Sequence, residues 1–564
     1  MPHATLYISA YLDSSNSFWI DIKSLIVLFV YKIAKTDEVK LIIQSLLDKP
    51  AEPLIKVSSE GLNFNTQSTI PDIAEFVVWP AIISGNQVTA GVCSVTRSLI
   101  KRSPNPDIRN LLGFREACLF SCSETSIWTR FCEVDIVQTI KHILVNNCCI
   151  GDEFHLPSDI VRFEYHLSTP VRIHNIYKVA RVKNKDKGIK SGIPTEELNI
   201  QHIFSEGPFM TLADVILYQC YEVFFKNCPF DLIKRRIPLT LSWFKRMEES
   251  ALSNYKFIIT NNNIQAKNIF EPDFIRHSLY TADPSRHKPE KRIFTKQNDI
   301  DVAFDLLQPI KCDIVNEETP FGKEIDFNWL DVPLEANPNG GALPKSRADR
   351  KCEQLENLAK AVMKIAAQKK YSIVDFCSGS GHLGILLATL LPNCEIVLVE
   401  NKERSLLRAK ERIEKLGLTN VFIVQSNLDY FQGNFDIGVA LHACGVATDL
   451  VIQNCINKKA HLVVCPCCYG GVRNCHHLTY PRSNQFKKLD LGLQNYLNLA
   501  HAADQTHDKE NVKTEQGYFC MNAVDTDRRL YIESFGYKVH LGKLYPTSCT
   551  NKNNLLVGLT KDSF

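Results

Sequence analysis

Three glycines and an acid in the second half of this chain are spaced as in a site for a nucleoside cofactor. Gly379, Gly381 and Gly384 follow the apolar run Ile373–Phe376, which is long enough for a buried strand of a parallel sheet. Such a turn lets the backbone approach a ligand, and the helix that follows offers free N–H groups. A second apolar run ends at Glu400, whose carboxylate can accept hydrogen bonds from both hydroxyls of a ribose.

The residues around the glycine turn favour S-adenosylmethionine over a dinucleotide such as NAD. Asp375 stands just before the turn in the pattern D-x-C-x-G-x-G. A carboxylate there repels a pyrophosphate but attracts a sulfonium and an amino group. Polar residues also follow the third predicted strand, Val421–Gln425, where an adenine is expected. The predicted cofactor-binding residues are Asp375, Cys377, Gly379, Gly381, Glu400, Asn427 and Asp429.

A histidine and a cysteine follow the fourth predicted strand, Phe435–Leu441. The carboxyl end of that strand faces the reacting group of a ligand in an open sheet of this kind. His442 can act there as a general base, because histidine titrates near neutrality, or it can only hydrogen-bond a neighbouring loop. We name His442 and Cys444 as candidate catalytic residues. The N-P-P-Y signature of amino-group methylases is absent from the sequence.

Four cysteines and two histidines lie within thirteen residues after the fifth predicted strand. The favoured interpretation of Cys465, Cys467, Cys468 and Cys475 is a tightly packed turn, so no metal is assigned. The second is a zinc or iron–sulfur site, for which these four are the only candidate ligands. In the third, Cys467 or Cys468 acts with Cys444 at the active site, by analogy with RNA cytosine C5-methyltransferases.

The elements that must hold these residues predict a Rossmann-like, seven-stranded domain over residues 342–564. A helix expected over Ser346–Lys369 leads directly into the first strand of the site. The chain closes with a helix, Asp525–Phe535, and two strands, Tyr537–Leu544 and Asn554–Leu559. This ending resembles the last helix and the reversed seventh strand of class I methyltransferases.

The first 105 residues predict a small domain in which strands and helices alternate. A strand is expected over Thr5–Tyr11, a helix over Trp19–Ala34, and a hairpin after Pro80. This order is typical of a thioredoxin-like domain, in which Pro80 would be the cis-proline. We interpret residues 1–105 as a degenerate thioredoxin-like domain.

Residues 106–255 predict an all-α domain. Apolar residues recur three and four apart over Asn110–Glu133, which predicts a helix there. Another helix should begin at Thr211, because Asp214 can reach back to it and complete a capping box. Residues 256–341 are irregular and polar, and we interpret them as a linker with short packed segments.

Composition places the chain among ordinary globular proteins. It has 564 residues, of which 45% are hydrophobic and 23% charged, so two to four domains are expected. The net charge of +3 argues against a global basic field. With 20 cysteines, no secretory signal and no apolar run long enough for a membrane span, we predict a reducing, cytoplasmic location.

Five motifs together resemble one known family. They are GPFMTLADVILY, PLTLSWFKRM, DFCSGSGHLG, LHACG and CPCCYG. They are similar to the glutathione S-transferase C-terminal domain-containing proteins, and the similarity extends over most of the chain. The resemblance implies a cytoplasmic protein with a glutathione-transferase-like front half and a methyltransferase-like back half.

The same resemblance argues against glutathione chemistry. Active glutathione transferases place an acid and a serine after the cis-proline hairpin to hold the γ-glutamyl group. The matching positions here are Val88 and Thr89. The acid is therefore missing, although Thr89 can replace the serine.

The predicted function is S-adenosylmethionine-dependent methyl transfer beside a non-catalytic transferase-like module that can bind a protein partner. RNA and protein are both open as acceptors, and Arg347, Arg350 and Lys351 favour RNA slightly. No membrane partner is expected. The alternative is a non-catalytic scaffold that retains both folds, and a glutathione-dependent enzyme is the least favoured reading.

Overall fold

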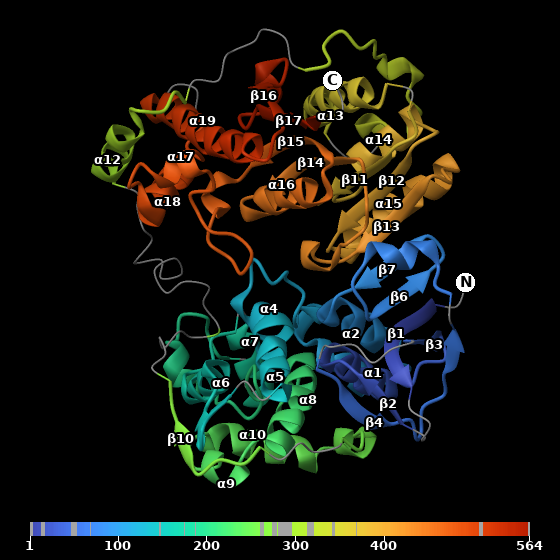
Figure 1. Ribbon diagram of the computed structural model, residues 1–564, viewed down its shortest axis with the longest axis vertical. Coiled ribbons are helices and arrows are strands. Elements are labelled where there is room, and N and C mark those ends of the chain that lie inside the picture. Colours follow the sequence, from blue (N-terminus) through green and yellow to red (C-terminus); the bar gives the residue numbers. More distant parts are fainter. Residues whose placement is uncertain are drawn as a thin grey trace. The chain divides into compact units, whose positions relative to one another are not determined.

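The computed structural model divides into two compact units, Met1–Ile293 and Phe294–Phe564, called unit 1 and unit 2 below (Figure 1). The finer division of the chain at residues 105, 255 and 341 stays a prediction. The structure describes residues 4–12, 17–46, 53–67, 69–145, 148–173, 175–185, 188–259, 264–272, 279, 296–312, 321–340, 344–367, 369–506 and 511–561.

Unit 1 begins with a mixed sheet centred on β1 (Ala4–Leu12). This strand pairs in parallel with β3 (Val39–Ser45) and antiparallel with β6 (Ala81–Ser84). β6 forms a hairpin with β7 (Gln87–Ala90). The Trp79–Pro80 peptide bond just before β6 is cis, so the prediction for Pro80 is confirmed. The remaining strands of this sheet are β2 (Ser17–Ile20), β4 (Ile55–Ser58) and β5 (Asn65–Gln67).

The first helix begins later than the sequence predicts. Trp19 lies on β2 and pairs with Tyr11 of β1, so a helix beginning at Trp19 is wrong. Helix α1 (Ile22–Ala34) begins where the Asp21 carboxylate accepts the backbone N–H of Ser24 at 2.8 Å. An aspartate N-cap satisfies a free N–H of the first turn, and this places the boundary.

The helical part of unit 1 is centred on the buried helix α8 (Leu212–Asn227). Thr211 and Asp214 form the predicted capping box at its start. The Asp214 carboxylate also accepts the indole N–H of the buried Trp243 at 2.8 Å. The other helices are α2 (Val92–Lys101), α3 (Pro106–Arg109), α4 (Ile127–Arg130), α5 (Ile136–Leu144), α6 (Ser158–Ser168), α7 (Ile176–Lys183), α9 (Phe230–Ile233) and α10 (Pro238–Glu249).

The helix predicted over Asn110–Glu133 is wrong. Gly113, Arg115 and Leu119 have positive φ angles, which a right-handed helix does not allow. The segment is therefore broken into short turns before α4. A second, three-stranded sheet lies in this unit, formed by β8 (Cys149–Ile150), β9 (Glu153–His155) and β10 (Asn268–Phe270). Because β8 and β9 fall within residues 106–255, that segment is not purely helical as predicted.

Unit 2 contains a seven-stranded sheet in the order β13-β12-β11-β14-β15-β17-β16. The first five strands in this order run parallel, and β17 is antiparallel to both of its neighbours. This order confirms the predicted Rossmann-like methyltransferase fold with a reversed last strand. The strands are β11 (Ser372–Phe376), β12 (Glu395–Glu400), β13 (Val421–Gln425), β14 (Ile437–Cys444), β15 (His461–Cys467), β16 (Lys538–Lys543) and β17 (Asn554–Leu559).

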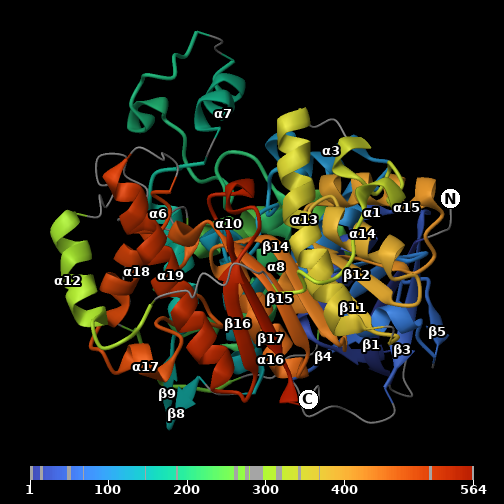
Figure 2. The same cartoon turned by 90° about the horizontal axis from the view of Figure 1, so that it is seen from above.

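The helices of unit 2, whose arrangement Figure 2 shows, contribute to two apolar cores among the described residues. One core packs α13 (Lys345–Ala366), α14 (His382–Leu390) and α15 (Glu403–Leu416) against the sheet. The other contains side chains of α12 (Gln297–Leu307), α16 (Val446–Lys458), α17 (Asn484–Lys487), α18 (Gly492–Ala502) and α19 (Val512–Glu533). In the described part of the chain, no helix is both long enough and apolar enough to cross a membrane.

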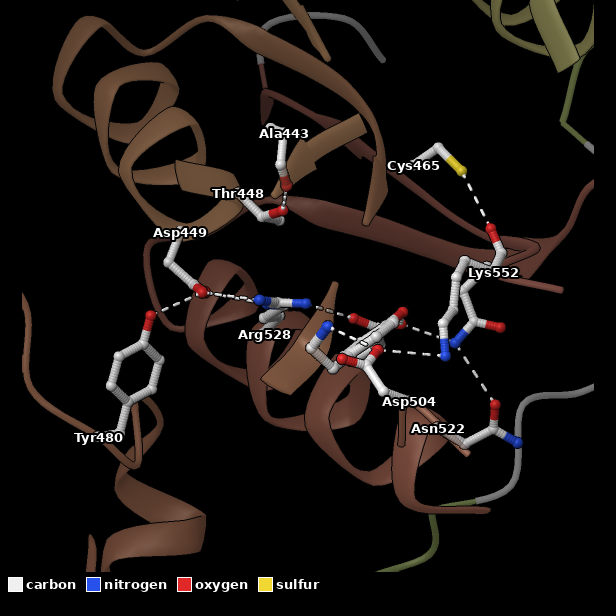
Figure 3. A network of polar contacts seen from close by, with 12 residues as sticks. Ala443, Thr448, Asp449, Cys465, Tyr480, Asp504, Asn522, Arg528 and Lys552 are labelled. Carbon is white, nitrogen blue, oxygen red and sulfur yellow. Dashed lines mark hydrogen bonds and ion pairs between the residues drawn. The ribbon is translucent and has the colours of Figure 1, made fainter. Parts of the chain in front are cut away.

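A buried guanidinium joins several elements of unit 2 (Figure 3). Arg528 of α19 is 1% exposed and donates two hydrogen bonds to the Asp449 carboxylate of α16, at 3.0 and 2.7 Å. It donates a third to Asp525 at 2.9 Å. Tyr480 donates to Asp449 at 2.8 Å, and Tyr469 donates to Asp525 at 2.5 Å. The Arg528 network therefore fixes α16, α19 and the turn after β15 together.

We predict that Asp449→Ala destabilises the protein strongly, because Arg528 would keep a buried charge without its bidentate partner. The expected loss is about 3–5 kcal/mol in the free energy of unfolding. The matched control is Arg529→Ala, one residue along α19, which breaks a half-exposed pair with Glu533 at 3.1 Å. It should cost at most about 1 kcal/mol. Equal losses in chemical denaturation of the two variants would contradict this role for the network.

Candidate functional site

The predicted glycine turn lies between β11 and α14. Gly381 has a φ of 70° and ends the turn as the residue before α14. At Gly384, in the first turn of α14, an added Cβ would lie 2.2 Å from Leu398 Cδ2 and 3.1 Å from Asp375 Oδ2. Only glycine lets this helix approach β12 so closely. The backbone therefore passes near the carboxyl ends of β11 and β12, where a ligand of such a fold binds.

Glu400 is held at the end of β12 by backbone groups. Its Oε2 accepts the N–H of Gly379 at 2.9 Å, and its Oε1 accepts the N–H of Lys402 at 2.9 Å. Each carboxylate oxygen has a second lone pair that these bonds leave over. Glu400 therefore both orders the glycine turn and can accept further donors such as hydroxyls.

Asp375 is a buried carboxyl at the end of β11, 2% exposed. Its Oδ2 accepts the N–H of Gly384 at 2.9 Å. Burial raises the pKa of Asp375 to about 7, although that hydrogen bond and the nearby Lys351 ammonium act in the opposite direction. A cation bound close to Asp375 would favour its ionised form.

Arg412 of α15 stabilises the glycine turn, a role that the sequence did not indicate. Its guanidinium donates to the carbonyl of Ser380 at 3.0 Å and lies 3.2 Å from His382 Nδ1. Burial and the Arg412 charge lower the pKa of His382 to about 3, so the imidazole is neutral at pH 7. The two residues are about 30 positions apart, and no local pattern could have paired them.

Asn427 and Asp429 follow β13, where adenine contacts were predicted. Asn427 is buried and begins the short turn Leu428–Tyr430. The Asp429 carboxylate contacts two imidazoles, His476 Nε2 at 3.0 Å and His477 Nε2 at 2.5 Å. Burial opposes ionisation of Asp429, but the hydrogen bonds from both histidines outweigh it and hold its pKa well below the usual value.

His442 lies at the end of β14 with a positive φ of 73°. Its Nε2 lies 3.1 Å from Oε1 of Gln354, whose amide nitrogen donates to the Cys549 carbonyl at 2.9 Å. The second bond fixes the amide orientation, so Nε2 carries the proton and Nδ1 is the basic nitrogen. Desolvation and the nearby Lys351 charge lower the pKa of His442 to about 4, so the ring is neutral at pH 7.

Three of the predicted cysteines come together at the ends of β14 and β15. The Sγ atoms of Cys444 and Cys467 lie 3.6 Å apart, and those of Cys444, Cys467 and Cys468 all lie within 4.8 Å of one another. We call these three the thiol cluster. Hydrogen bonds within it lower the pKa of Cys468 and raise that of Cys467.

The other two candidate metal ligands point elsewhere. The buried Cys465 thiol donates to the Lys552 carbonyl at 3.5 Å, and Cys475 packs in the core with α18 and α19. Neither belongs to the thiol cluster. The register of the two parallel strands explains why Cys467, and not Cys465, joins the thiol cluster. Both lie on β15, but only Cys467 pairs with Cys444 of β14.

The basic residues at the start of α13 separate into two kinds. Arg347 and Arg350 are exposed. Lys351 instead lies within electrostatic range of Asp375, Cys465 and Cys467, and burial lowers its pKa. Lys351 is therefore half-buried within electrostatic range of the site, while the two arginines are exposed.

Comparisons with known proteins agree with this architecture. A family model described as a methyltransferase domain matches residues 350–475. The chain is 44% identical over 498 residues to the glutathione S-transferase C-terminal domain-containing protein homolog of Drosophila melanogaster, covering 84% of this chain and 83% of that protein. It is 32% identical over 575 residues to the Homo sapiens glutathione S-transferase C-terminal domain-containing protein, covering 88% of each.

Solved structures show only a distant likeness. The SAH-bound methyltransferase PaMTH1 of Podospora anserina is 12% identical and matches 42% of this chain and 98% of that one, with a TM-score of 0.24.

We predict that Asp375→Asn changes how stability depends on pH. The pKa of Asp375 in the folded protein, about 7, lies above its ordinary value, so the wild type loses stability as pH rises from about 4 to about 7. The variant lacks this carboxyl and so avoids the loss of stability, which in the wild type is at most about 1.4 kcal/mol per pH unit. Its melting temperature relative to the wild type should therefore rise between pH 5 and pH 8. A pH-independent difference in melting temperature between Asp375→Asn and the wild type would refute the assignment.

Proposed function

This chain belongs to the glutathione S-transferase C-terminal domain-containing protein family, and we propose that its methyltransferase domain binds S-adenosylmethionine and transfers the methyl group to an RNA or protein acceptor. The observation that carries the proposal is the pair of acids at the ends of β11 and β12. Glu400 is held by Gly379 N–H beside the turn, and Asp375 is held by Gly384 N–H beneath it. A site that offers two carboxylates and a glycine turn suits a cationic nucleoside better than a pyrophosphate.

The residues present fit this cofactor in type and placement. Glu400 would accept the ribose hydroxyls, and Asp375 would face the positive charge. Cys377, Gly379 and Gly381 form the turn, where each has a positive φ. Asn427 and Asp429 would border the adenine, with Asp429 also bound to His476 and His477 as described above. The cofactor supplies a methyl group on a sulfonium, and the chain positions the acceptor and excludes water.

The acceptor would approach the ends of β14 and β15, where His442, Cys444, Cys467 and Cys468 lie. His442 is neutral at pH 7 and its Nδ1 can take a proton from an acceptor. Arg347 and Arg350 remain exposed and could contact a phosphate backbone. Lys351 is half-buried and within electrostatic range of Asp375, so it supports an RNA acceptor less than the two arginines do.

A non-catalytic scaffold is the second candidate. The observation that favours it is Asp429, whose two carboxylate oxygens already contact imidazoles. An adenine amino group would have to share or displace these contacts. Cofactor binding decides between the two functions.

Unit 1 would serve as a glutathione-transferase-like module, with a thioredoxin-like part and a helical part. Support comes from the strand order β3-β1-β6-β7, the cis Pro80 before β6, and the Thr211–Asp214 capping box. Val88 on β7 is fully buried, so it offers nothing to an amino group of glutathione. We propose that this module contacts a protein partner in the cytoplasm and does not catalyse.

Titration calorimetry with S-adenosylmethionine tests the cofactor assignment. Glu400→Ala removes a charged acceptor of two hydroxyls and should weaken binding by on the order of 2–3 kcal/mol, roughly 30- to 160-fold in Kd. Glu411→Ala, at an exposed acid on α15, is the control and should bind like the wild type. No binding to folded wild-type protein would favour the scaffold instead. Unchanged affinity of the Glu400 variant would refute only the role of Glu400.

Glutathione should bind weakly or not at all, because Val88 replaces the acid that holds its γ-glutamyl group. The measurement is retention of the full chain on immobilised glutathione, with an active glutathione transferase as the positive control. Specific elution by free glutathione, lost in Thr89→Ala, would show that this prediction is wrong.

A further inference from the structure

The thiol cluster has the composition and shape of a metal site. Cys444 ends β14, while Cys467 and Cys468 end β15 and begin the next turn. Cys444 and Cys468 are exposed and Cys467 is buried. The three soft sulfur donors therefore lie together, with one residue buried and two exposed to solvent. Thiolates of this kind select zinc over magnesium or calcium.

The sulfur separations match tetrahedral zinc. With zinc–sulfur bonds of about 2.3 Å, two sulfurs on a tetrahedral ion lie about 3.8 Å apart. Cys444 Sγ and Cys467 Sγ are 3.6 Å apart, and no sulfur in the thiol cluster is more than 4.8 Å from another. Small rotations of side chains would close the rest of the difference.

The backbone holds the thiols together without an ion. Gly445 donates its N–H to the Cys467 carbonyl at 3.1 Å. A Cβ on Gly445 would lie 2.6 Å from the backbone of Gly471, so the two strand-end loops meet at glycines. The turn after Cys468 is also tied down, since Asp504 accepts the N–H groups of Tyr469 and Gly470 at 3.1 and 2.9 Å. The donor atoms are therefore preorganised.

The charges around the thiol cluster suit an anionic site. Lys351 and Lys552 both lie within electrostatic range of its sulfurs. Three thiolates around a zinc ion carry a net charge of −1, which these ammonium groups would balance. Lys552 is itself fixed by Asp504 at 3.2 Å and Thr506 at 2.8 Å.

We propose that Cys444, Cys467 and Cys468 bind one zinc ion and leave its fourth coordination position open toward solvent. Among the described residues no fourth protein ligand joins the thiol cluster. Neither ring nitrogen of His442 belongs to the thiol cluster, and Cys465 bonds to the Lys552 carbonyl. Zinc with three protein ligands keeps a position for water or substrate, and a thiol bound there is deprotonated. The site thus takes a soft donor, and it stands independently of cofactor binding.

Metal content and cobalt spectroscopy test the proposal on the full chain. Protein purified without an affinity metal should contain about one zinc per chain by mass spectrometry, lost at least tenfold in Cys444→Ser and in Cys468→Ser. Both are exposed positions, and melting curves verify folding. Cobalt in place of zinc should show thiolate-to-metal charge transfer and a tetrahedral spectrum. Added 2-mercaptoethanol should shift that spectrum through the open position.

Matched variants separate this site from its rival. Cys475→Ser lies in the same loop outside the thiol cluster and should retain zinc. Asp429, His476 and His477 form the second group of metal-capable side chains among the described residues, and His477→Ala should also retain it. Zinc lost in His477→Ala but kept in Cys444→Ser would overturn the proposal. The proposal would also be overturned if the protein with its thiols reduced bound no added zinc, or if 2-mercaptoethanol left the cobalt spectrum unchanged.

Discussion

The neutralisation of one buried guanidinium supports the candidate site in unit 2. Arg528 is fully enclosed, and its charge is acceptable there only because Asp449 and Asp525 surround it. Those acids also bind Tyr480 and Tyr469, which belong to the segment after β15. Separation of these elements would expose an unpaired charge to an apolar interior. The network therefore holds the turn after β15 in one place, next to the end of β14.

One cation, Lys351, lies within electrostatic range of both the predicted cofactor site and the thiol cluster. Lys351 enters from α13, a helix that precedes the sheet in sequence, and lies within electrostatic range of both Asp375 and Cys467. Asp375 belongs to the side where a cofactor would lie, and Cys467 to the side where an acceptor would approach. A cofactor bearing positive charge would compete with Lys351 for Asp375.

The β6–β7 hairpin of unit 1 is built around an apolar residue at position 88. The hairpin of β6 and β7 forms a regular register, with Val88 paired to Ile83 in the core. An acid at position 88 would need a partner to be tolerated there, whereas valine needs none. The capping box of α8 is retained in full, since Asp214 serves Thr211, Ser205 and Trp243 at once. Asp214 is thus a polar side chain whose place in the core rests on the hydrogen bonds that it accepts there.

The sequence by itself determined the elements whose signals are local. The glycine turn, the acids at the ends of β11 and β12 and the capping box of α8 follow from residue types and spacing over short windows. The reversed last strand was expected from the resemblance to class I methyltransferases. Local signals misplaced the start of α1, because the apolar Trp19 suits a hairpin strand as well as a helix, and they joined Asn110–Glu133 across positions with positive φ.

Only the tertiary structure decided which distant residues meet. It placed Cys444 beside Cys467 and Cys468 but not beside Cys465 or Cys475, placed two imidazoles on Asp429, and left Lys351 half-buried within electrostatic range of Asp375. The physical reason is that strand register, close glycine contacts and the burial of Arg528 depend on pairs far apart in the chain. Such pairs leave no periodic trace in one sequence.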